Sequence, residues 1–344
     1  MKTNYLQLRR AMGIAMLVML LNVAGTKNTF AQNQVATLQH EGNISMFFGQ
    51  DALSAAHGAA EDGDTITLSS GNFNGCTISK SITIHGAGCD EDTIAGLVPT
   101  TITSEIALYN IINTAVPLTF EGLLCGNIRY GVSGSVCNNV IFKKCKVLKL
   151  CYDYHSYSVN NLQLIRCIIK DFYFTGQSAT IVNSVVKITA YNQNAVNNIN
   201  SIYNSILVCN DNIHLNNSEF YNSIIATGSG NNVTNTTFFN CINIQTGDTQ
   251  LFEGQVNNTN MTVENYNNVF ATFAGDVTFD NIYQLNSNIV NTFLGNDGTQ
   301  VGIYGGMMPY NTRPTYMIIK TINVAGRTTG DDKLGVQIEL NNAQ

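Results

Sequence analysis

A short period repeats through the middle of the chain and limits the possible fold more than any other feature. A small residue recurs every 17 to 22 positions, at Cys145, Cys167, Ser184, Ser205, Ser223 and Cys241. An apolar residue precedes each one by three positions, and most units have two apolar residues directly after it. Such a period indicates a solenoid whose repeats stack on their neighbours. We therefore predict an all-β fold, a single-stranded right-handed parallel β-helix.

One column of this repeat is rich in asparagine. The residues directly before the small ones are Lys144, Arg166, Asn183, Asn204, Asn222 and Asn240, and the chain has 46 asparagines in all. Asparagine tolerates the left-handed conformation of tight turns, and stacked amides bond to the amides above and below. We expect an asparagine ladder at one corner of the coils, with a role in the scaffold.

Both ends of a stacked sheet need closure, because open edges pair with other chains. At the first end, Asp51 to Ala60 is rich in alanine and predicts a short capping helix. At the far end, strand-like runs from Met317 to Val324 and from Leu334 to Leu340 flank a turn-rich stretch. These runs predict a terminal hairpin that covers the last coil.

The first 31 residues have the pattern of a secretory leader. Lys2, Arg9 and Arg10 precede an apolar run too short to span a bilayer, and small residues follow before Gln32. We predict four segments: a signal peptide at 1–31, a lead and capping helix at 32–64, the β-helix at 65–306, and capping strands at 307–344. No later stretch is apolar enough to span a membrane. The mature chain is expected outside the cytoplasm: extracellular, on the cell surface or in the periplasm.

Charge and cysteine content limit the partners and the chemistry. Loss of the leader's four basic residues would take the formal net charge from -6 to -10. Such an acidic chain is a poor partner for nucleic acid. The nine cysteines show neither a CxxC nor a metal-ligand spacing. We interpret most of them as small buried core residues, with one or two disulfides left open.

Two stretches resemble a known family. The run from Ala59 to Phe73, followed by Ile78 to Gly88, looks like the first two coils of pectin-lyase-like β-helix proteins. The run from Asp297 to Gly306, with Pro309 and Pro314, is similar to the final coil of uncharacterised secreted β-helix proteins of Bacteroidetes. Leu334 to Glu339 resembles their closing strand. The resemblance implies the fold and leaves the activity open, because this fold hosts lyases, hydrolases and inert adhesins.

Most of the positive charge of the repeat lies in three neighbouring coils. It includes the candidate ligand-binding residues Lys144, Lys146, Arg166, Lys170 and Lys187. Tyrosines and the weak catalytic candidates Asp153, His155 and Tyr157 follow nearby in the sequence. Such a group can hold an acidic glycan, with a histidine or tyrosine as proton carrier. The alternative is a solvated face without a ligand.

Family enzymes of this fold cluster their acidic residues, whereas the acids between residues 100 and 300 are scattered here. We therefore expect a non-catalytic, adhesin-like β-helix that binds a polysaccharide or an envelope or host protein. A divergent polysaccharide lyase or glycoside hydrolase acting on an acidic polysaccharide is the alternative, and a purely structural stalk is a third. No metal or cofactor is expected, with Ca²⁺ required only for a lyase.

Overall fold

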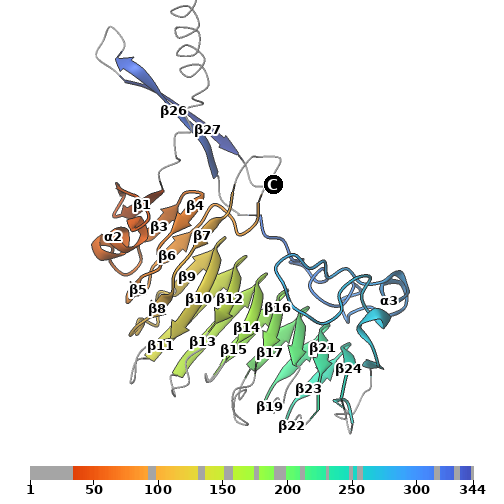
Figure 1. The fold of residues 1–344 in the computed structure, drawn as a ribbon. Coiled ribbons are helices and arrows are strands. Elements are labelled where there is room, and N and C mark those ends of the chain that lie inside the picture. Colours follow the sequence, from red (N-terminus) through yellow and green to blue (C-terminus); the bar gives the residue numbers. More distant parts are fainter. Residues whose placement is uncertain are drawn as a thin grey trace, which may run out of the picture. The chain divides into compact units, whose positions relative to one another are not determined.

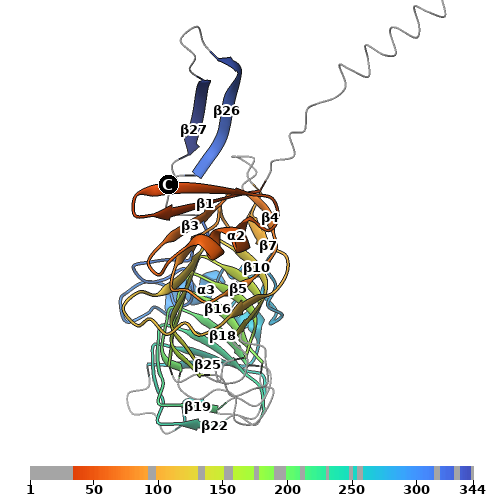
Figure 2. The ribbon, with the colours of Figure 1, turned by 90° about the vertical axis from the view of Figure 1, so that its left-hand side faces the viewer.

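The computed structural model describes residues 34–91, 98–130, 136–150, 158–173, 178–189, 199–209, 214–229, 232–247, 251–253, 259–313, 318–328 and 334–341. The predicted right-handed parallel β-helix is confirmed, because strands of successive coils pair in parallel in two long sheets (Figures 1 and 2). Sheet A has eleven strands, in the order β2 (Asn43–Phe48), β1 (Val35–His40), β3 (Thr65–Leu68), β6 (Thr83–His85), β9 (Leu118–Glu121), β11 (Val136–Lys143), β13 (Ser158–Ile165), β15 (Ala179–Val182), β17 (Ile199–Tyr203), β20 (Glu219–Tyr221) and β23 (Thr237–Phe239).

Sheet B has twelve strands. Ten follow the order β4 (Gly71–Phe73), β7 (Thr100–Ile102), β10 (Leu124–Tyr130), β12 (Lys146–Leu150), β14 (Ile168–Phe172), β16 (Val185–Ile188), β18 (Ile206–Cys209), β21 (Ile224–Thr227), β24 (Ile242–Gln245) and β25 (Met261–Val263). The other two, β5 (Thr77–Ile78) and β8 (Ile106–Leu108), pair beside them. A separate parallel pair joins β19 (His214–Asn216) to β22 (Asn232–Thr234).

The core lies between the two sheets. The apolar column recognised in the sequence stacks in register on the inner face of sheet A, as Phe142, Leu164, Ile181, Ile202, Phe220 and Phe238. All six are at most 2% exposed. Phe120 extends the column, and its ring stacks on Phe142 with centroids 4.9 Å apart. Period-two alternation accounts for this arrangement, because alternate side chains of a strand point to opposite faces.

The corner between sheet A and sheet B repeats the same backbone in every unit. Its residues have φ between 46° and 55°, namely Lys144, Arg166, Asn183, Asn204, Asn222 and Asn240. The left-handed conformation turns each coil, as the asparagine column predicted. The small residues that follow point inward and form a buried ladder. The hydroxyl of Ser205 accepts a hydrogen bond from the backbone N–H of Ser184, and the hydroxyl of Ser223 accepts one from the backbone N–H of Ser205. Each coil is thereby pinned to the next.

Hydrogen bonds between asparagine side chains occur at another corner. Asn139, Asn161, Asn217 and Asn235 also have positive φ there. Asn161 donates to the amide oxygen of Asn139, and Asn235 donates to that of Asn217 at 2.8 Å. The predicted amide ladder between coils is therefore present, at a position that the aligned column did not include.

Helix α2 (Ala52–Ala59) lies beside β1 and β3 at the first coil (Figure 2). Its side chains Ala52, Leu53 and Ala56 are buried in the main core, as expected for a cap. The structure adds the antiparallel hairpin β1–β2, which pairs with β3 and extends sheet A beyond the first coil.

The parallel stack ends at β25, whereas the sequence placed its end near residue 306. The chain continues through a 3₁₀ helix, η1 (Tyr266–Asn268), and helix α3 (Ser287–Thr292). Strands β26 (Ile318–Thr328) and β27 (Leu334–Asn341) form the predicted antiparallel hairpin. Its place over the last coil stays a prediction.

Eight cysteines lie in the described residues, and all eight are free thiols. Seven are buried, so the interpretation of most cysteines as core residues is confirmed. Burial raises the pKa of Cys125 and Cys167 to about 12. These thiols are therefore protonated and unreactive at neutral pH.

The serine ladder gives a test of how the coils are joined. Ser205→Ala removes the acceptor for the Ser184 N–H, at 3.2 Å, and the donor to the Tyr203 carbonyl, at 2.7 Å. Leaving a buried N–H without this partner costs about 1–3 kcal/mol. We expect a loss of that size in the free energy of unfolding measured with urea. Ser201→Ala, on the outer face of the same coil, is the control and should change it by less than about 0.5 kcal/mol.

Candidate functional site

Residues 264–313, here called the strap, cover the outer face of sheet B (Figure 1). The outward residues just after the small ones are apolar and in register, as Ile168, Val185, Ile206, Ile224 and Ile242. They form a second hydrophobic cluster with strap residues that include Val269, Phe270, Phe273, Tyr283 and Ile303. Sheet B is thus buried on both faces over these coils.

The strap is held at the asparagine corner by side-chain amides. Asn183 donates to the carbonyls of Ile303 and Gly305, at 3.0 and 2.8 Å. Asn222 both donates to and accepts from Asn296, at 3.0 and 2.9 Å. Asn240 donates to the Leu294 carbonyl at 3.1 Å. The column predicted as a ladder between coils therefore binds the strap instead, which remains a scaffold role.

Glycines let the strap lie close to the corner. A Cβ on Gly302, which has a φ of 77°, would stand 3.0 Å from the Ile224 side chain. A Cβ on Gly305 would stand 2.9 Å from the side-chain nitrogen of the corner residue Asn204. The run from Asp297 to Gly306 resembles a final coil in sequence. In the structure it is part of the strap and lies outside the parallel stack.

The strap also engages three of the predicted ligand-binding cations. Lys144 Nζ donates to the Arg313 carbonyl at 2.5 Å, and Arg166 Nε donates to that of Met308 at 3.2 Å. Lys146 Nζ binds the carboxylate of Asp90 and the Phe279 carbonyl. Burial lowers the pKa of Lys144. These three cations satisfy backbone carbonyls and an acid of the same chain, a role that leaves them less able to bind an acidic ligand.

Two further predicted ligand-binding residues lie on strands of sheet B, and the catalytic candidates lie outside the described residues. Lys170 and Lys187 lie half-buried on strands β14 and β16 of sheet B. The catalytic candidates Asp153, His155 and Tyr157 fall in 151–157, outside the described residues. Lys144, Lys146 and Arg166 thus make contacts with the strap, whereas no contact of Lys170 or Lys187 with it is found among the described residues.

The outer face of sheet A carries a continuous column that the sequence reading did not recognise. Its residues pair in register on successive coils, as His85, Glu121, Lys143, Ile165, Val182, Tyr203, Tyr221 and Phe239. They alternate with the buried column, so they point away from the core. We call them the sheet A outer column.

Ionisable groups gather at the first end of this column. His85 Nδ1 lies 3.8 Å from the Glu121 carboxylate, and Lys143 is opposite Glu121 in the strand register of the next coil. Burial lowers the pKa of His85 despite the opposing effect of Glu121. His85, Glu121 and Lys143 are far apart in the sequence, and the strand register brings them together.

Aromatic residues form the other end. The rings of Tyr203 and Tyr221 stack with centroids 5.1 Å apart, and those of Tyr221 and Phe239 stack at 4.9 Å. Tyr203 is 37% exposed. Since the ring faces contact each other, the column presents ring edges and phenol groups to the outside. Such groups combine apolar contact with hydrogen bonding.

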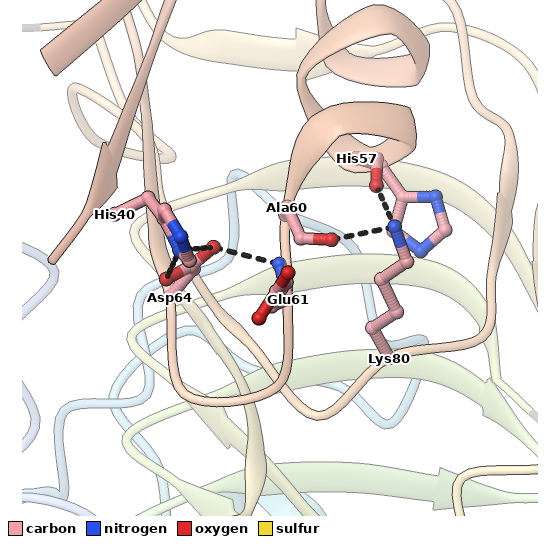
Figure 3. A network of polar contacts seen from close by, with 6 residues as sticks. All are labelled: His40, His57, Ala60, Glu61, Asp64 and Lys80. Atoms are coloured by element: carbon pink, nitrogen blue, oxygen red, sulfur yellow. Dashed lines mark hydrogen bonds and ion pairs between the residues drawn. The ribbon is translucent and has the colours of Figure 1, made fainter. Parts of the chain in front are cut away.

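A polar network lies at the N-terminal cap (Figure 3). His40 Nδ1 is 2.9 Å from Asp64, and this hydrogen bond raises the pKa of His40. Lys80 Nζ donates to the carbonyls of His57, Gly58 and Ala60 at the end of α2. Unsatisfied carbonyls at a helix end favour a cation. We interpret the network as a structural clamp on the cap.

No group of three or more metal-ligating side chains occurs among the described residues. The same part of the chain holds no helix long and apolar enough to cross a membrane. Comparison with protein-family models, curated proteins and solved structures finds no match to this chain.

The strap contact can be tested at its buried amide. Asn222→Gly keeps the left-handed backbone and removes both hydrogen bonds to Asn296. Asn235→Gly is the control, since it has a similar φ of 52° and an exposed amide contact. We expect Asn222→Gly to cost about 1–3 kcal/mol and the control less than about 1 kcal/mol in urea unfolding. Equal costs would mean that the strap contributes nothing at this corner.

The cap should be sensitive to acid. His57 accepts from the Ser79 N–H at 3.1 Å, and burial lowers its pKa to about 4. Between pH 6.5 and 4, His57 is protonated in the unfolded chain but remains neutral in the folded chain. The free energy of unfolding therefore falls as the pH falls through this range. We expect a loss of about 1–2 kcal/mol at pH 4, after allowance for solvent screening. Unfolding of His57→Gln across this range should show a shallower decline, and parallel curves would contradict the assignment.

Proposed function

We propose that this chain is an exported, non-catalytic β-helix protein that binds a polysaccharide, or an envelope or host protein, along the sheet A outer column. The main support is the difference between the two sheets. The outer face of sheet B is covered by the strap, whereas Tyr203 and its stacked neighbours remain accessible on sheet A. A surface of regularly spaced hydroxyl and aromatic groups suits an extended ligand better than a small molecule.

The neighbouring outward column supports the same proposal. It consists largely of hydroxyl and amide side chains in register, including Gln163, Thr180, Ser201 and Thr237. When a sugar binds, such side chains can replace their hydrogen bonds to water with hydrogen bonds to the sugar hydroxyls. Lys143, at the first end of the sheet A outer column, adds a hydrogen-bond donor beside the acceptor Glu121.

A lyase or hydrolase acting on an acidic polysaccharide is the second candidate. The observation that favours it is the cluster of His85, Glu121 and Lys143 next to Lys144, whose pKa is lowered by burial. A lowered pKa moves an amine toward the range in which it accepts a proton. A lyase of this kind would also require Ca²⁺ beside the substrate carboxylate.

Binding of residues 32–344 to neutral and acidic polysaccharides separates these functions. We expect saturable binding without depolymerisation, and a Kd at least tenfold higher for the double variant Tyr203→Ser with Tyr221→Ser. Met307→Ser, at a side chain 99% exposed, is the matched control and should bind as the parent does. Thermal unfolding checks that the variants fold.

Two outcomes would contradict the proposal. Release of unsaturated or reducing ends that Glu121→Gln or His155→Ala abolishes would establish the enzyme. Absence of saturable binding to any polysaccharide or envelope protein would leave a structural stalk.

A further inference from the structure

Strand β2 is the last strand at one end of sheet A, and its sequence lacks two common features of protected edge strands. It contains neither a charged residue nor a proline, the devices that keep edge strands from pairing. Ile44, Met46 and Phe48 are 70%, 52% and 64% exposed, whereas Phe47 packs against the core. Among the described residues, β1 is the only strand that pairs with β2, so the outer edge of β2 combines backbone groups without a strand partner with an apolar stripe.

Two independent features select which residues of β2 would pair with another strand. The turn at Glu41 and Gly42 has positive φ at both positions, which makes a two-residue hairpin. In such a hairpin Asn43, Ser45 and Phe47 exchange hydrogen bonds with β1, and the Gly49 N–H bond to Gln34 fits this alternation. The backbone groups of Ile44, Met46 and Phe48 therefore point to the open edge.

We propose that a second copy of this chain docks on this edge, with β2 pairing antiparallel to β2 of the partner. A two-fold axis at Met46 places each Met46 opposite the other, and each Ile44 opposite a Phe48. In this register the residues with free backbone groups pair with each other. The apolar side chains of both copies also share one face, which a shift by one residue would destroy.

The patch fits a second copy because the strand is complementary to itself under this symmetry. Side chains of this size and exposure offer roughly 400 Å² per copy, about half of one partner's share of a standard interface. The new backbone hydrogen bonds add to this area. We expect a weak, reversible dimer with a Kd of roughly 10–100 μM.

Sedimentation of residues 32–344 over a range of concentrations tests the dimer. Met46→Lys places two ammonium groups together at the axis, and we expect it to raise the dimer Kd at least 30-fold. Met307→Lys is the control, because it adds the same charge at another exposed methionine. A monomeric parent at 200 μM, or a dimer that Met46→Lys leaves unchanged, would overturn the proposal. A monomeric parent that Met46→Lys destabilises would show that this chain covers its own edge.

Oxidative cross-linking tests the register. Hydrogen-bonded residues opposite each other have Cα atoms about 5.5 Å apart, within the range of a disulfide. Met46→Cys should therefore give a covalent dimer, whereas Ile44→Cys faces Phe48 and should cross-link far less. The parent chain, whose described cysteines are mostly buried, gives the background. Equal cross-linking at positions 44 and 46 would overturn the register.

Discussion

The left-handed corner between sheets A and B is the constraint on which the rest of the molecule depends. One residue per coil takes positive φ, and the next residue turns inward to join the buried ladder. The corner thereby aligns the end of each sheet A strand with the same position in the next coil. The inner column of sheet A, the outer column of sheet A and the outer apolar stripe of sheet B all follow from that register, because each strand alternates its faces.

The same corner explains why the strap is needed. Strands of sheet B have consecutive apolar residues, as in Ile168–Ile169 and Ile224–Ile225, so one member of each pair faces outward. Residues 264–313 bury these side chains and supply carbonyls to the amides of the corner. Lys144 and Arg166, which replace asparagine in the first two coils of the column, bind strap carbonyls in the same way, and Lys146 on β12 binds a third.

The sequence was sufficient for the fold, because a recurring small residue, an apolar residue three positions before it and an asparagine column together indicate stacked coils. It was insufficient for the strap and the site. Two apolar residues in succession mark a strand buried on both faces, yet they do not identify the segment that covers the second face. His85, Glu121 and Lys143 are far apart in the chain and meet through strand register. The basic patch of the sequence was read from proximity along the chain, without the backbone carbonyls that three of its members bind.

The strap makes the stabilities of distant coils depend on one another. In a repeat protein without such a segment, each coil contacts only its two neighbours, and the terminal coils can unfold one at a time. Here a single segment contacts the corner from Asn240 back to Lys144, so loss of the terminal coil also removes the outer cover of coils far from it. Opening one end therefore becomes coupled to opening the middle. The strap can dock only after those coils have stacked, so its docking is a late step in folding. Docking also requires that the coils have the correct register.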